Sequence, residues 1–379
     1  MWGSGVRIPI SPPRKIIRYA HNHVAQPIFK IHLTMSKKLF ITGNEAVVLG
    51  AIDAGAQVMF GYPITPATEI LQGWVAKAEE NKKLQYLQTE DEIAAGFGVL
   101  GAVLAGSKAF TASAGPGHVL LQDALAMAEN LRLPFVGIMM QRGGPSTGTV
   151  NFSQQEVTLA AFGGNGDGLR VVYSASSVAE MYELTIQAFN TAWEYRFPTI
   201  VLGDGYLAKT IKTVQLKKPE KIVNSYPILE EKEKPTYLRN CYSSEEALGK
   251  VLKKNIGDWK KLASQIIKSE NYLTDDVEIL ILAHGLVAAA AKEAIDKMRK
   301  DNIKIGLFRP ITLNPIDNIS LKKAIKNANK IYIIESSLNQ FARIIKYELA
   351  GLKNEFVEIS KPAEGFTPEE IITRIKQNG

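Results

Sequence analysis

Apolar residues at helical spacing alternate with short apolar, β-branched runs from about residue 43 to residue 205. This alternation is typical of parallel α/β sheets, in which a helix connects each strand to the next. Residues 135–140 and 199–202 are almost entirely apolar, as in strands that helices cover on both faces. The pattern predicts a doubly wound parallel sheet over residues 35–210. Its strands are expected near 57–61, 84–88, 108–112, 134–140 and 198–203, and its helices near 44–55, 67–80, 92–105, 117–130 and 176–194.

The pattern breaks in residues 211–272, which are rich in Lys, Glu and Pro and predict a solvated connector with one helix near 244–268. A second α/β unit is expected over residues 273–379, because strand and helix patterns resume there. Each predicted unit has an ordinary domain size. The expected strands of the second unit lie near 277–283, 303–308, 330–335 and 355–358, and its helices near 286–300, 316–328 and 338–351.

The formal charge of +7 comes from the beginning of the chain. Residues 1–40 hold Arg7, Arg14, Lys15, Arg18, Lys30, Lys37 and Lys38 and no acidic residue. Of the 45 basic residues, 38 therefore remain in the rest of the chain, against 38 acidic residues. A surface that binds nucleic acid needs clustered excess positive charge, so no nucleic-acid partner is expected.

Residues 1–34 allow three interpretations. A transit peptide fits their basic, acid-poor composition but would contain more Ser, and a disordered basic tail fits as well. We favour a start codon assigned too early, with translation beginning at Met35. The string Val6-Arg7-Ile8-Pro9 is what the T-arm of a tRNA gene yields when it is read in frame.

Cys241 is the single cysteine of the chain. It excludes a disulfide within the chain, an all-cysteine zinc site and a cysteine-ligated iron–sulfur cluster, since each needs several thiolates. The sequence contains no run of about 18 or more apolar residues, so no membrane-spanning helix is predicted. Without a secretory signal, the expected location is the cytoplasm.

Four loops rich in turn and polar residues follow predicted strands of the first unit. Ligands of open α/β sheets bind at the carboxyl ends of the strands, so we expect the four loops to meet at one edge. They are Gly61-Tyr62-Pro63-Ile64-Thr65-Pro66, Thr89-Glu90-Asp91-Glu92, Ser113-Ala114-Gly115-Pro116-Gly117-His118 and Gln141-Arg142-Gly143-Gly144-Pro145-Ser146-Thr147-Gly148.

The first two loops each present one candidate functional residue. Thr65 lies between two prolines, and it either caps the following helix or offers its hydroxyl to a ligand, which we favour. Glu90 and Asp91 are explained as acids that complement a helix dipole. Glu92 begins a helix whose packing face consists of small residues, so its carboxylate should be partly buried and needs a partner.

The third and fourth loops add an amide cradle and a cation. Gly115, Pro116 and Gly117 open a helix and leave free amides that suit a phosphate or carboxylate. His118 is more simply a hydrogen-bonded residue at a helix start than a catalyst. Arg142 ends a buried strand beside several glycines, where it suits carboxylate capture, the alternative being a surface ion pair.

Together, these loops resemble the α subunit of 2-oxoacid:ferredoxin oxidoreductases. Further matching strings are Gly43-Asn44-Glu45-Ala46 and, in the second unit, 306–313 and 335–340. The resemblance extends from Met35 to about Ser360. It implies a thiamine-diphosphate-binding fold with a pyrimidine-type domain, followed by a transketolase C-terminal-like α/β domain. This chain departs from the family pattern at two places: it has Asn339 where the family usually has Gly, and its residues 148–152 lack the Pro-Thr that is usual in the family.

The resemblance also implies roles for individual residues. Glu92, rather than Glu90, would hydrogen-bond N1′ of the cofactor's aminopyrimidine and favour the tautomer that removes the thiazolium C2 proton. Thr65 and Arg142 match positions that hold the substrate's carboxylate and 2-oxo group. No metal ligand is predicted in this chain. The cofactor-binding residues would be Tyr62, Pro63, Ile64, Gly115 and Gly117.

The implied reaction is the oxidative decarboxylation of a 2-oxoacid to carbon dioxide and an acyl-coenzyme A, with electrons passing to ferredoxin. Gly166-Asp167-Gly168 and Gly203-Asp204-Gly205 are interpreted as turns, since no Asn-Asn follows to complete a diphosphate site. A β subunit would therefore hold the diphosphate and Mg²⁺, and partner chains would carry the iron–sulfur clusters. Further γ and δ subunits fit the family, whereas no membrane partner is expected.

Several functions remain open at this point. 2-Oxoglutarate is the favoured substrate, because the loops at 90–94 and 142–148 look most like that subgroup, with pyruvate and branched-chain 2-oxoacids as alternatives. A non-oxidative thiamine-dependent transferase or decarboxylase would need no iron. A regulatory subunit with a decayed site is disfavoured, because Thr65, Glu92 and Arg142 are all present.

Overall fold

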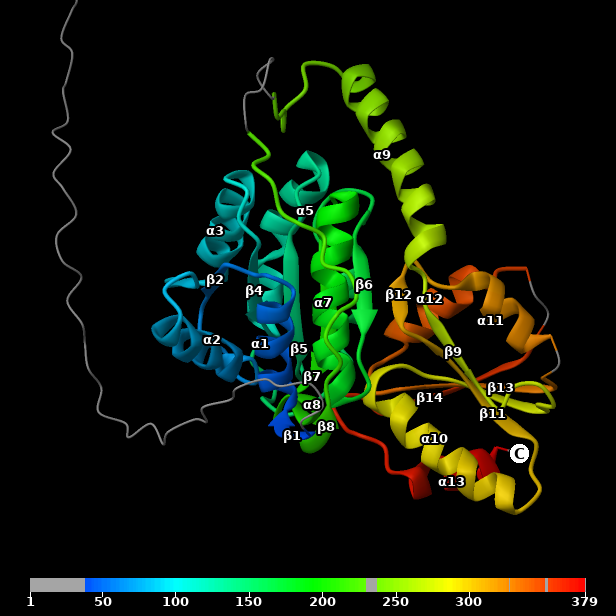
Figure 1. Ribbon diagram of the computed structural model, residues 1–379. Helices are drawn as coiled ribbons and strands as arrows, with labels where there is room; N and C mark the ends of the chain where they lie inside the picture. Colours follow the sequence, from blue (N-terminus) through cyan, green and yellow to red (C-terminus); the bar gives the residue numbers. More distant parts are fainter. Residues whose placement is uncertain (1–37, 230–236, 327, 352–353, 379) are drawn as a thin grey trace, which may run out of the picture. The chain divides into compact units, whose positions relative to one another are not determined.

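Seven strands form the larger main sheet of the computed structural model, which describes residues 38–229, 237–326, 328–351 and 354–378. The leader over residues 1–34 lies outside the described residues. All neighbouring strands except one pair run parallel, which confirms the predicted doubly wound sheet (Figure 1). In spatial order, they are β12 (Thr312–Asn314), β6 (Val171–Ser174), β7 (Thr199–Asp204), β5 (Val136–Gln141), β4 (Ala109–Ser113), β2 (Val58–Gly61) and β3 (Gln85–Gln88).

Helices pack on this sheet at the positions that the apolar spacing predicts. The helix expected over 117–130 is divided at Leu121, which keeps helical backbone angles, so the division is slight. The strand β6 and a six-residue helix were not predicted, because both are short and flank the glycine-rich stretch 163–168. The helices are α1 (Gly43–Asp53), α2 (Thr68–Glu80), α3 (Glu92–Leu104), α4 (Pro116–Leu120), α5 (Gln122–Leu131), α6 (Val157–Phe162) and α7 (Val178–Tyr195).

The centre of the large sheet is the core of this part of the chain. Every residue of β4, β5, β6 and β7 is buried, so both faces of these strands are covered. The edge strand β3 is exposed along its whole length, with Tyr86 and Leu87 open to solvent. The hydrophobic effect therefore stabilises the central strands most strongly.

A second sheet of five strands follows later in the chain, with three helices on the predicted pattern: α10 (Gly285–Lys300), α11 (Asn318–Ile325) and α12 (Gln340–Glu348). A last helix, α13 (Pro368–Gln377), was not predicted, although Thr367 and Glu370 form a capping box at its start. The strand order is β14 (Phe356–Ser360), β13 (Lys330–Glu335), β10 (Ile279–Leu282), β11 (Ile305–Pro310) and β9 (Ser269–Tyr272), the last pairing antiparallel with β11.

The stretch between the two sheets is more structured than its composition suggests. β8 (Ile211–Gln215) pairs antiparallel with β1 (Lys38–Thr42), and the short α8 (Gly205–Lys209) precedes it. The helix expected near 244–268 is α9 (Glu245–Ile266), which Ser244 caps. β9 follows α9 and belongs to the five-stranded sheet.

Residues from the later part of the chain complete the large sheet. β12 adds antiparallel to β6, and the Asn314 amide donates hydrogen bonds to the carbonyls of Gly168 and Arg170 at 3.0 and 2.9 Å. In the other direction, Phe152 is buried in the core of the five-stranded sheet. Each part of the chain therefore contributes residues to the sheet or core of the other part, and the local sequence pattern does not reveal these contributions.

A buried arginine also joins the two sheets. Arg309 on β11 donates to Glu180 Oε1 on α7 at 2.8 Å and to Glu270 Oε2 on β9 at 3.1 Å. Only 2% of Arg309 is exposed, so these two carboxylates, rather than water, stabilise its positive charge. The helices of the described residues do not combine the length and the apolar character that a membrane span needs.

Candidate active site

The loops after β2, β3, β4 and β5 meet at the carboxyl edge of the large sheet, as predicted. Three contacts join them in pairs. Arg142 Nη1 donates to the Thr65 carbonyl at 2.7 Å, which connects the fourth loop to the first. Ser113 Oγ lies 3.4 Å from Glu92 Oε1, which connects the third loop to the second. The third and fourth loops are joined through the Glu156 carboxylate, which accepts from Gly115 N and Arg142 N.

Glu92 is the first residue of α3, and the neighbouring Asp91 caps that helix by accepting from Ala94 N at 2.8 Å. Only 3% of Glu92 is exposed. Burial raises the pKa of its carboxyl above the usual value, against the lowering effects of backbone and Ser113 hydrogen bonds. A buried carboxyl with a raised pKa is suited to hold a proton and to share it with a neighbouring base.

Gly117 makes room for the Glu92 carboxyl. A Cβ at Gly117 would overlap both Glu92 Oε1 and Ser113 Oγ, so a side chain there would displace the carboxyl. Gly117 itself is buried at the start of α4. Glycine is therefore required at position 117 because the Glu92 carboxyl approaches its backbone closely.

Gly115 has a related role towards Arg142. Its φ is +54°, a left-handed backbone that favours glycine, and a Cβ there would lie 2.7 Å from Arg142 Nε. Arg142 is only 5% exposed, so the alternative of a surface ion pair is wrong. Its Nε is buried and has no hydrogen-bond partner among the described residues. One buried donor of the guanidinium is thus unpaired among the described residues.

Thr65 does not cap the helix that follows it. α2 begins at Thr68, its N-cap position is Ala67, and no side chain caps it. The Thr65 side chain is exposed and lines a cavity of about 390 Å³. In the same loop, Tyr62 and Pro63 are exposed and Ile64 is half-buried. Val150, Asn151, Gly205, Tyr206, Lys209 and Thr210 complete the cavity wall.

Sequence reasoning missed Glu156, which is 4% exposed and holds two of the loops together. Its Oε1 accepts from Gly115 N at 2.9 Å and from Arg142 N at 3.0 Å, and its Oε2 lies 2.8 Å from His118 Nδ1. His118 is fully buried, as expected for a hydrogen-bonded helix-start residue, but its Nε2 has no partner among the described residues. The sequence alone shows Glu156 as an isolated acid after the glycine-rich loop at 141–148, with no helix predicted beside it, and such a residue carries little information.

The two Gly-Asp-Gly strings have different structures. Gly166-Asp167-Gly168 lies in an irregular loop with positive φ at both glycines, in agreement with a turn. Asp204 instead ends β7 and caps α8 by accepting from Leu207 N at 2.9 Å, so the interpretation of 203–205 as a turn is wrong. Complete burial raises the pKa of Asp204 to about 7.

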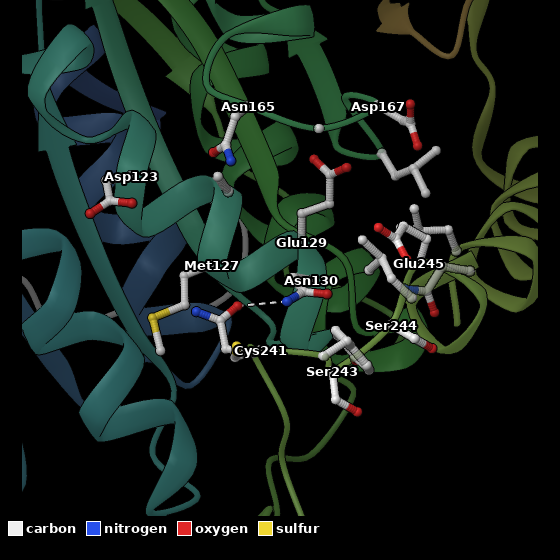
Figure 2. A pocket seen from close by; sticks show the side chains of 18 residues that line it. Asp123, Met127, Glu129, Asn130, Asn165, Asp167, Cys241, Ser243, Ser244 and Glu245 are labelled. Carbon is white, nitrogen blue, oxygen red and sulfur yellow. Dashed lines mark hydrogen bonds between the residues drawn. The ribbon is translucent and has the colours of Figure 1, made fainter. Parts of the chain in front are cut away.

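Another hollow of about 580 Å³ lies away from these loops, between α5, the loop at 165–169 and the start of α9 (Figure 2). Its wall includes the carboxylates of Asp123, Glu129, Asp167 and Glu245, and no Lys or Arg side chain among the described residues lines it. None of the predicted site residues lines it. In the part of the chain that the structure describes, no group of three or more His, Cys, Asp or Glu residues is arranged to hold a metal ion.

Comparison with known families agrees with this geometry. Residues 49–255, more than half of the chain, match the thiamine-diphosphate-binding domain of pyruvate flavodoxin/ferredoxin oxidoreductases. Residues 277–370 match core domain II of pyruvate:ferredoxin oxidoreductase. The chain therefore belongs to the 2-oxoacid:ferredoxin oxidoreductases, as an α subunit of an oxidoreductase. This confirms the resemblance predicted from the four loops.

Two curated relatives illustrate the range of the family. The 2-oxoglutarate synthase subunit KorA from Methanocaldococcus jannaschii is 34% identical over 350 residues, which cover 84% of this chain and 93% of that protein. The ketoisovalerate oxidoreductase subunit VorB from Methanothermobacter marburgensis is 33% identical over 324 residues, which cover 81% of this chain and 88% of that protein. The two identities are too similar to select a substrate.

Solved structures show the same fold. A 2-oxoglutarate:ferredoxin oxidoreductase from Magnetococcus marinus, with 2-oxoglutarate, coenzyme A and succinyl-CoA bound, superposes with a TM-score of 0.80 at 28% identity. The match covers 90% of this chain and 65% of that chain. A split-gene transketolase matches with a TM-score of 0.56 at 12% identity over 88% of this chain and 96% of that chain, a likeness of fold alone.

Proposed function

We propose that this chain supplies the pyrimidine-binding half of a thiamine-diphosphate site and the groups that hold a 2-oxoacid, within a multisubunit oxidoreductase. The arrangement that carries the proposal is the pair of buried groups at one sheet edge, the Glu92 carboxyl in its Gly117 recess and Arg142 bound to the Thr65 carbonyl. An acid that shares its proton and a cation that binds a carboxylate are the two functions that such a site requires.

The residues around Glu92 fit the pyrimidine ring of the cofactor. Thiamine diphosphate, when bound, supplies the nucleophile and the electron sink for decarboxylation. Burial keeps the Glu92 carboxyl protonated to a higher pH than usual, so it donates a hydrogen bond to a ring nitrogen. Tyr62, Pro63 and Ile64 belong to the loop after β2 at the same edge, and Gly115 and Gly117 leave room there for the side chains of Arg142 and Glu92.

Arg142 and Thr65 are proposed to hold the substrate. The Arg142 guanidinium has one hydrogen bond to the Thr65 carbonyl, and its buried Nε remains without a partner among the described residues. A planar guanidinium with free donors binds a carboxylate through two parallel hydrogen bonds. We propose that the exposed Thr65 hydroxyl donates to the 2-oxo oxygen of the substrate.

The rest of the reaction is assigned to partner chains. We propose that a β subunit holds the diphosphate and Mg²⁺ and that iron–sulfur clusters on other subunits pass electrons to ferredoxin, with coenzyme A as the acyl acceptor. The cofactor half-site would occupy residues 35–210, with 211–272 as the connector and 273–379 as the transketolase C-terminal-like domain. γ and δ subunits are further expected partners.

Among 2-oxoacids, 2-oxoglutarate is the proposed substrate. Among the described residues, the wall of the cavity beside Thr65 has one charged residue, Lys209, whose ammonium is paired with Glu69. A cation at this position is suited to the distal carboxylate of a dicarboxylic 2-oxoacid, whereas a branched-chain or short 2-oxoacid has no group for it. KorA and the Magnetococcus enzyme, which are named for 2-oxoglutarate, support this choice, and VorB supports the branched-chain alternative.

The decisive test is coenzyme A-dependent reduction of a viologen dye by the complex of co-expressed subunits. 2-Oxoglutarate, pyruvate and 2-oxoisovalerate are offered separately. Reduction with 2-oxoglutarate alone is expected, and reduction with another substrate would change the substrate but not the reaction. A complex that contains thiamine diphosphate but no iron, and that reduces no dye with any substrate, would favour a non-oxidative reaction instead.

A further inference from the structure

We infer that Glu156 is a positioning residue, which fixes the Gly115 turn and the strand end at Arg142 relative to each other. This inference rests on the proposed function of Arg142. Glu156 belongs to neither loop, yet its carboxylate accepts from the backbone N–H of both residues, at 2.9 Å and 3.0 Å. Both bonds reach the same oxygen, Oε1, so the two loops cannot separate without breaking one of them.

The carboxylate is directed away from the helix it precedes. Glu156 is the N-cap residue of α6, a position where an acid ordinarily accepts from the first helical amides, but it makes no such bond. Its second oxygen, Oε2, pairs with His118 Nδ1 at 2.8 Å instead. The Gln141 side chain accepts from Glu156 N at 3.3 Å. All the side-chain bonds of Glu156 therefore serve the loops of the candidate site.

Because Glu156 and His118 are buried, the loss of one of these hydrogen bonds is costly. The Glu156 side chain is 6% exposed and His118 is fully buried, so water does not replace a lost bond easily. Hydrogen bonds from backbone amides to a buried carboxylate are charge-assisted and stronger than neutral ones. Loss of the carboxylate would leave buried donors unsatisfied next to the Arg142 side chain, which already lies against Gly115.

The segment that carries Glu156 is itself held by residues from the later part of the chain. Gln154 exchanges two hydrogen bonds with the backbone of Ser336, at 3.1 and 2.9 Å, and donates to the His284 carbonyl at 2.9 Å. Gln340 donates to the Gln155 carbonyl at 2.7 Å and accepts from Thr158 N at 3.1 Å. The Glu156 carboxylate is therefore fixed from behind, as a positioning residue must be.

The test is Glu156→Gln in the co-expressed complex, with Glu129→Gln as the matched control. Glu129 is also buried, at 7% exposed, and pairs with Arg170, but it lines the hollow away from the site. Both variants should lower the melting temperature. Only Glu156→Gln should raise KM for the 2-oxoacid, by about tenfold or more, while kcat changes much less. Glutamine keeps one acceptor oxygen but loses the negative charge that strengthens both backbone hydrogen bonds and the contact with His118, so Arg142 is held less firmly.

A double-mutant cycle separates positioning from general destabilisation. If Glu156 acts through Arg142, then Glu156→Gln should change KM by no more than about twofold when Arg142 is already Met. Equal KM effects of Glu156→Gln in both backgrounds would overturn the inference, as would equal KM in the Glu156→Gln and Glu129→Gln complexes. No turnover by the unmodified complex would overturn the proposed function together with this role, whereas unmodified turnover with unchanged KM in Glu156→Gln would overturn the role alone.

Two milder variants apply if Glu156→Gln does not assemble. Glu156→Asp keeps the charge but shortens the side chain by one methylene, so it should raise KM because it cannot reach both amides. Glu129→Asp shortens a buried carboxylate that lies away from the site and should leave KM close to the unmodified value. An unchanged KM in Glu156→Asp, or a KM in Glu129→Asp as high as in Glu156→Asp, would contradict the role of the carboxylate.

Discussion

The Arg142 side chain lies directly against Gly115, and a Cβ at Gly115 would lie 2.7 Å from Arg142 Nε. Two residues that are 27 positions apart in the sequence thus constrain each other: the cation occupies the space that only glycine leaves free. Because the φ of Gly115 is also positive, glycine is required there for two independent reasons.

Gly115→Ala should therefore lower both stability and substrate affinity. Gly55→Ala is the matched control, since Gly55 also has a positive φ, of 78°, but meets only Lys108 Nζ at 3.7 Å. Each substitution carries a positive-φ backbone penalty of about 1–3 kcal/mol. Steady-state kinetics should show a raised KM for the 2-oxoacid in Gly115→Ala only, and a raised KM in Gly55→Ala would contradict this explanation.

Glu92→Gln should reduce kcat of the complex by about 10²–10⁴-fold with assembly intact, because the amide cannot share a proton as the carboxyl does. Glu90→Gln provides the control, since Glu90 lies in the same loop but is exposed. Viologen reduction and size-exclusion chromatography measure activity and assembly separately. Full activity in Glu92→Gln would favour a regulatory subunit over a catalytic one.

Lys209→Met should lower kcat/KM for 2-oxoglutarate by about 10–100-fold and leave 2-oxoisovalerate within about threefold, because only the dicarboxylate uses the cation. Lys212→Met is a suitable control, as Lys212 is exposed on the neighbouring β8 and does not line the cavity beside Thr65. Parallel losses for both substrates would mean that Lys209 acts on the structure of the site rather than on specificity.

Asp204 should make the stability of the protein depend on pH. Burial raises the pKa of this carboxyl from 3.8 to about 7, so its stabilising contribution is complete below about pH 4 and is lost as the pH rises through 7. Asp204→Asn stays neutral at every pH and keeps a helix cap. The free energy of unfolding of the variant, relative to that of the unmodified protein, should therefore increase from pH 5 to pH 8.

The size of this change is about 3 kcal/mol, at roughly 1.4 kcal/mol for each of the two pH units between pH 5 and the pKa of about 7. Thermal unfolding of both proteins across this pH range measures it. Asp167→Asn is the internal control, because Asp167 lies in the other Gly-Asp-Gly string and is exposed. A constant difference between the Asp204→Asn variant and the unmodified protein would show that Asp204 does not change its protonation in this range.

One departure from the family pattern has a simple structural explanation. Asn339, where the family usually has Gly, adopts φ 58° and ψ 28° just before α12. Asparagine is among the few residues other than glycine that tolerate this left-handed conformation. The Asn339 side chain also accepts from Ser360 Oγ at 2.8 Å, which ties the helix start to the end of β14.

The sequence by itself determined the order of most strands and helices along the chain, with β6, β12 and α13 among the exceptions, and it determined which four loops follow the strands at the candidate site. Both depend on short-range periodicity and on turn residues such as Gly115 and Pro63, whose effects are local. The single cysteine likewise excluded a cysteine-ligated cluster in this chain without any structure.

Only the tertiary structure decided which groups meet. Thr65 and Arg142 are 77 residues apart, and Glu156 reaches Gly115 across 41 residues, so no local pattern contains either contact. The addition of β12 to the large sheet and the raised pKa of Asp204 have the same origin. Burial and hydrogen-bond partners arise from packing between distant segments, and the chemistry of this site depends on both.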